Sequence, residues 1–217
     1  MANVLITGCS RGLGYHLNRQ FFLEGHSVYP HTRTKEQGGY ITGELTDQDT
    51  IADIIECIAN CHINIFINNA SVYYKSMGDT LFDNDTIHDV IDVNFSSQLA
   101  LLKEVYTYLN HNHRKNSLIV NVSSLAAKFP SANESVYCAT KAGINSYLKC
   151  LQLESSPKNL KFLDVYIGAM KTDMSKHRND YDTLIDPKEV SKCLYNIINS
   201  TLNYNTMYIN EITIRKI

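Results

Sequence analysis

The sequence contains no tryptophan, only four prolines and no strong excess of either charge. Lysine and arginine number 20 against 22 acidic residues, which gives a formal net charge of −2. This balance argues against the basic surface that binds nucleic acid or an anionic membrane. No apolar run approaches the ~18 residues of a membrane-spanning helix, and the first residues carry no signal-type stretch. We therefore expect no nucleic-acid partner and no membrane association.

The six cysteines lack the spacing of a disulfide framework or of a zinc site. Cys57 and Cys61 stand four residues apart on a predicted helix, which matches neither pattern. The cluster His111-Asn112-His113 has no carboxylate or cysteine beside it, so we interpret it as a solvated helix end. The sequence predicts free thiols in the cytoplasm and no metal site.

Short apolar runs alternate along the chain with longer amphipathic ones. The apolar runs predict strands at residues 3–7, 27–31, 63–67, 117–122 and 161–167, with shorter ones at 39–43 and 206–209. Pro30 weakens the second strand or places the proline at its end. The amphipathic repeats predict helices at 12–24, 47–59, 84–111, 134–154 and 187–202, the second of them behind a Thr46 cap.

Most of these strands are uniformly apolar, which is typical of a parallel sheet covered by helices on both faces. No linker, internal repeat or low-complexity stretch divides the 217 residues. The chain therefore predicts a single domain over residues 1–217, an α/β fold with a doubly wound parallel sheet in three α/β/α layers.

Three of the ten glycines, Gly8, Gly12 and Gly14, fall within seven residues between the first predicted strand and helix. Open parallel sheets bind ligands at this carboxyl edge, where free N–H groups and the helix dipole attract anions. Glycine lets a phosphate approach the backbone without a Cβ in the way. The turn predicts a pyrophosphate site, although its spacing is not G-x-G-x-x-G and such a turn can be only a turn.

Further motifs follow the glycine turn in a fixed order. They are N-N-A-S at 68–71, Asn94 in D-V-N-F, S-S at 123–124 and Y-x-x-x-K at 137–141. Together with T-G-x-x-x-G-x-G at 7–14, they resemble the short-chain dehydrogenase/reductase family over nearly the whole chain. The resemblance implies a Rossmann fold, a nicotinamide cofactor and a catalytic group made of Asn94, Ser124, Tyr137 and Lys141.

The chemistry of hydride transfer suits these side chains. A carbonyl oxygen that gains negative charge needs a proton donor near neutral pH. Tyr137 and Lys141 share one helix face, so the lysine charge is expected to lower the tyrosine pKa. Ser124 can supply a hydroxyl to the substrate oxygen. By resemblance, Lys141 also holds the nicotinamide ribose and Asn94 completes a water-linked proton relay.

The residues after the second strand predict the cofactor. An acid there accepts the ribose 2′-hydroxyl of NAD, but the stretch 31–34 contains none. Arg33, with Arg11 of the glycine turn, suits the 2′-phosphate of NADP (NADPH), although both could be solvated surface arginines. NAD remains the alternative. With the positions that the family resemblance assigns, the expected cofactor set is Gly8, Ser10, Arg11, Gly12, Leu13, Gly14, Thr32, Arg33, Glu44, Leu45, Asn68, Ala70, Tyr137, Lys141, Gly168 and Thr172.

Two positions depart from the family pattern. Ser71 replaces the glycine of N-N-A-G, so this turn is expected to be tighter or differently packed. Ile167 replaces the proline of P-G-x-x-x-T, so the loop that carries Thr172 is expected to be less rigidly set. Neither change removes a catalytic group.

The substrate region is short, because only residues 173–185 separate Thr172 from the last predicted helix. We expect an open or shallow pocket. Lys171, Lys176 and Arg178 could attract an acidic substrate, or they could be simply solvated. By position after the family motifs, the expected pocket walls are Tyr73, Tyr74, Phe129, Met170 and Met174.

The sequence favours an NADPH-dependent carbonyl reductase or alcohol dehydrogenase acting on a small molecule. The alternative is an NADP(H)-binding regulatory protein with little turnover, which would not require Ser124, Tyr137 and Lys141 together. A nucleotide-sugar epimerase or dehydratase generally needs a larger C-terminal substrate region. The family commonly pairs subunits through its two long central helices, here 84–111 and 134–154, so we expect a homodimer.

Overall fold

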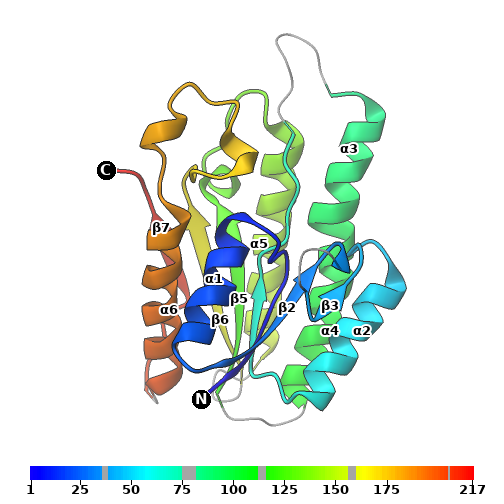
Figure 1. Ribbon diagram of the computed structural model, residues 1–217. Helices are drawn as coiled ribbons and strands as arrows, with labels where there is room; N and C mark the ends of the chain where they lie inside the picture. The colour runs from blue at the N-terminus through cyan, green and yellow to red at the C-terminus, as the bar shows by residue number, and fades with distance from the viewer. Residues whose placement is uncertain (36–38, 75–81, 112–115, 156–159, 205) are drawn as a thin grey trace.

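The computed structural model describes residues 1–35, 39–74, 82–111, 116–155, 160–204 and 206–217. Its centre is a seven-stranded sheet in which every neighbouring pair is parallel, in the order β3-β2-β1-β4-β5-β6-β7. The strands are β1 (Asn3–Ile6), β2 (Ser27–Thr32), β3 (Ile41–Thr42), β4 (Ile65–Asn68), β5 (Ser117–Ser124), β6 (Leu160–Ile167) and β7 (Glu211–Ile214). The predicted doubly wound parallel sheet is confirmed (Figure 1).

Helices cover both faces of the sheet. The α-helices are α1 (Gly12–Leu23), α2 (Gln48–Asn60), α3 (Asn84–Ile91), α4 (Ser97–His111), α5 (Ser135–Glu154) and α6 (Pro187–Asn203). Helices α1 and α6 lie side by side on one face (Figure 1). In β1, Val4 and Ile6 pack with these two helices, whereas Leu5 packs with α2, α4 and α5. A strand buried on both faces has no polar side, which explains its uniformly apolar sequence.

The predicted helix at 84–111 is interrupted. Helix α3 passes into a π-helix at Asp92–Ser96, and α4 continues from Ser97. Asn94 is fully buried in this π-helix. Short π-helical segments inside α-helices are frequent at functional sites, and this one lies where the family resemblance expects a catalytic residue.

Two local predictions need correction. The strand expected at 206–209 is wrong, because β6 pairs instead with Glu211–Ile214 and the N–H of Asp164 donates to the Asn210 carbonyl. The N-cap of α2 is Asp47, whose carboxylate accepts the Asp49 N–H at 3.0 Å, and not Thr46.

Pro30 lies inside β2, one residue before the pairing with β3 begins. Its carbonyl accepts the Tyr40 N–H at 2.7 Å. The backbone nitrogen and carbonyl of one strand residue point to the same neighbouring strand, so the nitrogen of Pro30 also faces β3. Because proline has no N–H, a hydrogen bond is lost on the side of the short β3 and none is lost between β2 and β1.

Candidate active site

The glycine turn between β1 and α1 is built for close backbone contact. Gly8 has φ of +72°, which favours glycine. A Cβ on Gly14 would lie 2.2 Å from the Gly8 carbonyl oxygen and 2.5 Å from the Asn69 amide nitrogen. Arg11, the N-cap of α1, makes no side-chain cap bond, so no side chain of the N-cap satisfies the first N–H groups of this helix. The turn is therefore a backbone cradle that fits the pyrophosphate of a dinucleotide.

The loop after β6 lies against this cradle. A Cβ on Gly12 would lie 3.4 Å from Cγ2 of Thr172. Met170 and Ile185 form a parallel bridge, and the Lys171 N–H donates to the Ile185 carbonyl at 2.8 Å. These bonds join the base of the loop to the segment before α6. Nearby, the Gly168 N–H donates to β7.

Sequence reasoning missed His31, which links the cradle to the end of β3. The Gly8 N–H donates to Nδ1 of His31 at 3.4 Å, and Nε2 lies 3.0 Å from the Gly43 carbonyl oxygen. These two hydrogen bonds require the neutral tautomer of His31 that carries its hydrogen on Nε2. Burial lowers the pKa of His31, which also favours the neutral ring. A histidine at the carboxyl end of β2 is the signal that could have revealed it.

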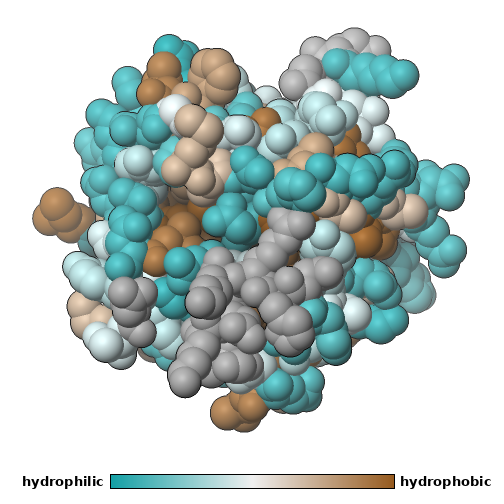
Figure 2. Space-filling model, turned by 90° about the horizontal axis from the view of Figure 1, so that it is seen from below, coloured by the Kyte–Doolittle hydropathy of each residue, from teal (hydrophilic) through white to brown (hydrophobic). Residues whose placement is uncertain are grey.

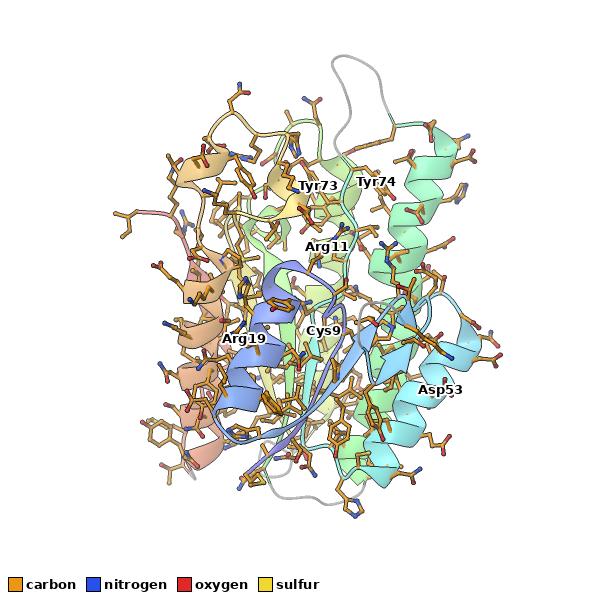
Figure 3. All side chains as sticks on the ribbon, viewed as in Figure 1. Cys9, Arg11, Arg19, Asp53, Tyr73 and Tyr74 are labelled. Carbon is orange, nitrogen blue, oxygen red and sulfur yellow. The ribbon has the colours of Figure 1, made fainter. Side chains whose placement is uncertain are left out.

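The two arginines expected at the ribose stand on the same carboxyl edge. Figure 3 labels Arg11 at the start of α1. Its nearest Nη is 3.7 Å from Asp173, and that of Arg33 is 3.9 Å from Glu44. Their side chains are 67% and 53% exposed, so these ion pairs are weak and both guanidinium groups can turn toward a ligand.

Several residues that were expected to contact the cofactor have side chains that are buried or hydrogen-bonded to other protein groups. Thr32 is buried and donates its hydroxyl to the Thr34 carbonyl at 2.9 Å. The Asn68 amide nitrogen donates to Gln98 and Asn121, both at 3.1 Å. Leu45 is also buried. Contact of Thr32 and Leu45 with a ligand would therefore come from their backbone, whereas the buried Oδ1 of Asn68 has no hydrogen-bond partner among the described residues. The remaining expected positions Ser10, Leu13 and Ala70 lie in the cradle or at the end of β4 beside it.

Ser124, Tyr137 and Lys141 meet beyond the carboxyl end of β5. Ser124 ends the strand, and its Oγ accepts the Ala126 N–H at 3.1 Å. Tyr137 lies in the first turn of α5, and Nζ of Lys141 is 5.7 Å from its ring centroid. Lys141 is buried, and Nζ is 3.5 Å from the Val122 carbonyl oxygen. The predicted triad is thus one cluster.

The electrostatics of this cluster differ from the expected pattern. Burial raises the pKa of Tyr137 to about 12, while hydrogen bonding to Ser124 and Ser71 acts in the opposite direction and the Glu134 charge adds to the rise. Burial also lowers the pKa of Lys141 to about 8. The expected lowering of the Tyr137 pKa is therefore wrong, because burial disfavours the charged forms of both Tyr137 and Lys141.

Asn94 holds the segment that follows β4. Its Oδ1 accepts from the Ser71 hydroxyl at 3.0 Å and from the Val72 N–H at 2.8 Å, and its amide nitrogen donates to the Val72 carbonyl at 2.7 Å. The side chain of Asn94 is thereby committed to the protein. The Ser71 hydroxyl, which a glycine would lack, donates to Asn94 in this turn.

Tyr73 packs against Tyr137. Its ring meets the Tyr137 ring edge to face at 5.1 Å, and it stacks on His177 at 5.8 Å. Its hydroxyl donates to Glu134 at 2.7 Å. Among the other expected pocket walls, Phe129 is 54% exposed and its ring lies against Arg215.

The basic residues of the substrate loop are paired with neighbouring acids. Lys171 contacts Asp182 at 2.9 Å, Arg178 contacts Asp180 at 2.9 Å, and Lys176 pairs with Asp173. All of these are partly or well exposed. The pairing leaves little net positive field for an acidic substrate.

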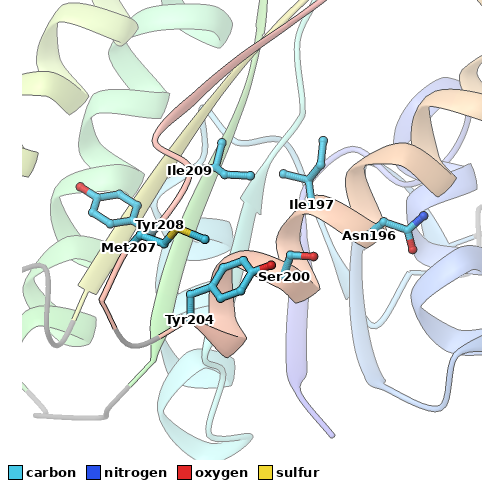
Figure 4. Close-up of a pocket in the computed structure, with 7 residues that line it drawn as sticks. All are labelled: Asn196, Ile197, Ser200, Tyr204, Met207, Tyr208 and Ile209. Atoms are coloured by element: carbon cyan, nitrogen blue, oxygen red, sulfur yellow. The ribbon is translucent and has the colours of Figure 1, made fainter.

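A cavity of about 350 Å³ lies away from this edge, between the end of α6 and the residues before β7 (Figure 4). It is lined by Asn196, Ile197, Ser200, Tyr204, Met207, Tyr208 and Ile209. Seen from below, the surface carries small hydrophobic patches separated by hydrophilic residues (Figure 2). This cavity holds none of the predicted site residues.

Within the described ranges, no group of three or more histidine, cysteine, aspartate or glutamate residues is placed to hold a metal. Asn112 and His113 of the histidine cluster lie outside these ranges. No helix in the described part of the chain is long and apolar enough to cross a membrane.

Comparison with known proteins identifies the family of the chain. A family model described as short chain dehydrogenase matches residues 2–183. The NADPH-dependent 1-acyldihydroxyacetone phosphate reductase of Schizosaccharomyces pombe is 29% identical over 78% of this chain and 60% of its own length. The NADP-dependent 3-hydroxy acid dehydrogenase of Escherichia coli strain K12 is 26% identical over 97% of this chain and 95% of its own. The chain spans about 60% of the length of two curated relatives that it matches.

Solved structures share the fold. A short-chain dehydrogenase/reductase from Vibrio parahaemolyticus has a TM-score of 0.84 at 23% identity, with 99% of this chain and 100% of that one covered. An alcohol dehydrogenase from Thermococcus sibiricus, complexed with 5-hydroxy-NADP, has a TM-score of 0.83 at 18% identity, with 100% and 97% covered.

Proposed function

The chain belongs to the short-chain dehydrogenase family of NAD(P)-dependent oxidoreductases, and we propose that it transfers a hydride between NADP(H) and a carbonyl or secondary alcohol of a small molecule. The convergence of Ser124, Tyr137 and Lys141 beside a glycine cradle carries this proposal. A purely regulatory nucleotide-binding protein would need the cradle but not the buried lysine beside a tyrosine.

The cradle fits a dinucleotide. Gly8, Gly12 and Gly14 give backbone access that a Cβ would block at Gly14, and the start of α1 supplies N–H groups for the pyrophosphate. Arg11 and Arg33 would hold the ribose 2′-phosphate. When bound, the nicotinamide supplies or accepts the hydride.

The protein side chains then manage the proton. In carbonyl reduction, Tyr137 donates its phenolic proton to the substrate oxygen, and in alcohol oxidation it takes that proton back. The Oγ of Ser124 accepts a backbone N–H, and its hydroxyl hydrogen would donate to the substrate oxygen when substrate is bound. Lys141 would contact the nicotinamide ribose and, when protonated, favour the phenolate that remains on Tyr137.

A screen of aldehydes and ketones for NADPH consumption tests the proposal. We expect at least one small carbonyl compound to be reduced, with loss of NADPH absorbance that depends on the protein. Tight NADPH binding with no turnover on any compound would contradict the proposed enzyme and favour the regulatory alternative.

Cofactor preference gives a prediction of its own. NADPH is expected to bind at least about tenfold tighter than NADH, or about 1.4 kcal/mol, because only NADPH has a phosphate for the two arginines. Replacing Arg33 with alanine should weaken NADPH and leave NADH unchanged in calorimetry. Arg19→Ala, an exposed arginine on α1, is the matched control. Equal affinities of the unmodified protein would refute the assignment.

Assembly and location complete the proposal. We propose a homodimer through α4 and α5, because Ala139, Ala142 and Leu153 leave small or apolar side chains exposed on α5. Gly143 faces the Phe95 ring of its own chain, because a Cβ there would lie 2.6 Å from that ring, and it is therefore not a residue of the proposed interface. Light scattering should give twice the 24.6 kDa of one chain, and a mass of one chain would refute it.

The free thiols of all six cysteines suit the reducing cytoplasm.

A further inference from the structure

The side chain of His31, near the carboxyl end of β2, contacts two backbone segments of the proposed cofactor site. The Gly8 N–H of the glycine turn donates to Nδ1 at 3.4 Å, and Nε2 lies 3.0 Å from the Gly43 carbonyl oxygen. The backbone carbonyl of His31 also accepts the Cys9 N–H at 2.9 Å. One residue of β2 is therefore bonded both to the turn expected to hold the pyrophosphate and to the segment that leads to residues 44–45, expected at the adenine.

The two glycines that His31 joins have no room for a side chain. Gly8 has φ of +72° and Gly43 has φ of +151°, values that favour glycine. A Cβ on Gly8 would lie 2.9 Å from Cα of Ala70, and a Cβ on Gly43 would lie 2.0 Å from Oγ1 of Thr50. Neither glycine can therefore link the two segments by a side chain of its own, and His31 supplies the link.

The two contacts of the His31 ring require opposite chemistry. A backbone N–H needs an acceptor and a carbonyl needs a donor, and neutral imidazole carries one of each on its two nitrogens. Burial lowers the pKa of His31, so the ring is neutral at about pH 7. The residue is 1% exposed, so water does not replace either bond. A side chain without this donor and acceptor would leave both backbone groups without their partner.

Resting on the proposed function, we infer that His31 is a positioning residue that holds the glycine turn and the segment after Gly43 at the spacing that the pyrophosphate and adenosine of the cofactor require. Both of its side-chain bonds go to backbone groups, and neither involves the ribose 2′-phosphate. NADPH and NADH share the pyrophosphate and the adenosine and differ only in the phosphate proposed for Arg33. His31 therefore supports the affinity for both cofactors equally, whereas Arg33 supports that for NADPH alone.

The test is calorimetry of the full chain with NADPH and, separately, with NADH, and it needs no substrate. His31→Leu keeps much of the side-chain volume and removes both bonds, and it is expected to weaken both cofactors about tenfold. His31→Gln brings back one acceptor and one donor on a side chain of similar reach. It is expected to bind both cofactors within about twofold of the unmodified protein.

The matched control is His26→Leu. His26 precedes β2 at the opposite end of the strand, and its Nδ1 also accepts a backbone N–H, that of Ala2, at 3.1 Å. The substitution removes the same kind of bond away from the glycine turn. It is expected to leave both affinities unchanged, even where it lowers the midpoint of thermal unfolding.

Unchanged affinities in His31→Leu would overturn the inference, as would a loss confined to NADPH. A loss in His31→Gln as large as that in His31→Leu would also overturn it, because the shape of the ring and not its two bonds would then matter. Should His31→Leu fail to fold, His31→Asn takes its place with the same expectation, because its shorter amide cannot reach both glycines.

The outcome for His31 is separate from that for the proposed enzyme. An equal loss of both cofactors in His31→Leu, with no carbonyl turnover by the unmodified protein, would uphold the role of His31 while the proposed enzyme fails. Normal turnover with unchanged affinities in His31→Leu would do the reverse.

Discussion

Tyr137→Phe is expected to lower kcat for carbonyl reduction at least about a hundredfold, the usual scale of general acid catalysis. The substitution removes the only phenolic proton of the Ser124–Tyr137–Lys141 cluster and keeps the ring that Tyr73 packs against. NADPH affinity should change little, because the phenol does not hold the phosphates. Steady-state rates and NADPH titration of the same preparation provide both readings.

The matched control is Tyr208→Phe. Its hydroxyl accepts from Gln152 at 2.6 Å beside the cavity at the end of α6, away from the predicted site. It should keep normal turnover. Near-normal turnover in Tyr137→Phe would contradict the mechanism.

Lys141→Met is expected to abolish turnover and, at pH 7, to raise the free energy of unfolding by about 3 kcal/mol. Burial lowers the pKa of Lys141 to about 8 from an ordinary value of 10.5. At pH 7 the folded chain therefore holds an ammonium that burial disfavours, whereas the unfolded chain solvates it freely. Methionine fills a similar volume without the charge.

The sign of the pH dependence follows from the same shift. The unfolded state binds more protons than the folded state between about pH 8 and pH 10.5, so the stability of the unmodified protein rises with pH there. The advantage of Lys141→Met should be complete below pH 8 and should close by about pH 10.5. Chemical denaturation at several pH values measures it, with exposed Lys149→Met on the same helix as control. A pH-independent difference would contradict the assignment.

The sequence predicts the sheet and the cluster well because both depend on short-range patterns. Apolar runs in the sequence predicted the positions of β1, β4, β5 and β6. Because the strands are parallel, Ser124 at the end of β5 lies at the same edge of the sheet as Tyr137 and Lys141, which are one helical turn apart on α5. The roles of Asn94, Ser124, Tyr137 and Lys141 remain predictions that the variants test.

Features decided by tertiary packing could not be read in this way. The last strand, at 211–214, depends on its register with β6, and the run at 206–209 is equally plausible alone. The rise of the Tyr137 pKa reflects burial, which the spacing from Lys141 does not reveal. The aspartates that pair with Lys171 and Arg178 become partners only through the fold of the loop.

The most direct test of the central claim follows the hydride itself. NADPH that carries deuterium at the transferable C4 position of the nicotinamide is incubated with the protein and a carbonyl compound found by the screen. The account predicts an alcohol with deuterium on its carbinol carbon, formed by the unmodified protein and not by Tyr137→Phe. Alcohol without deuterium at that carbon, or equal labelled product from Tyr137→Phe, would contradict it.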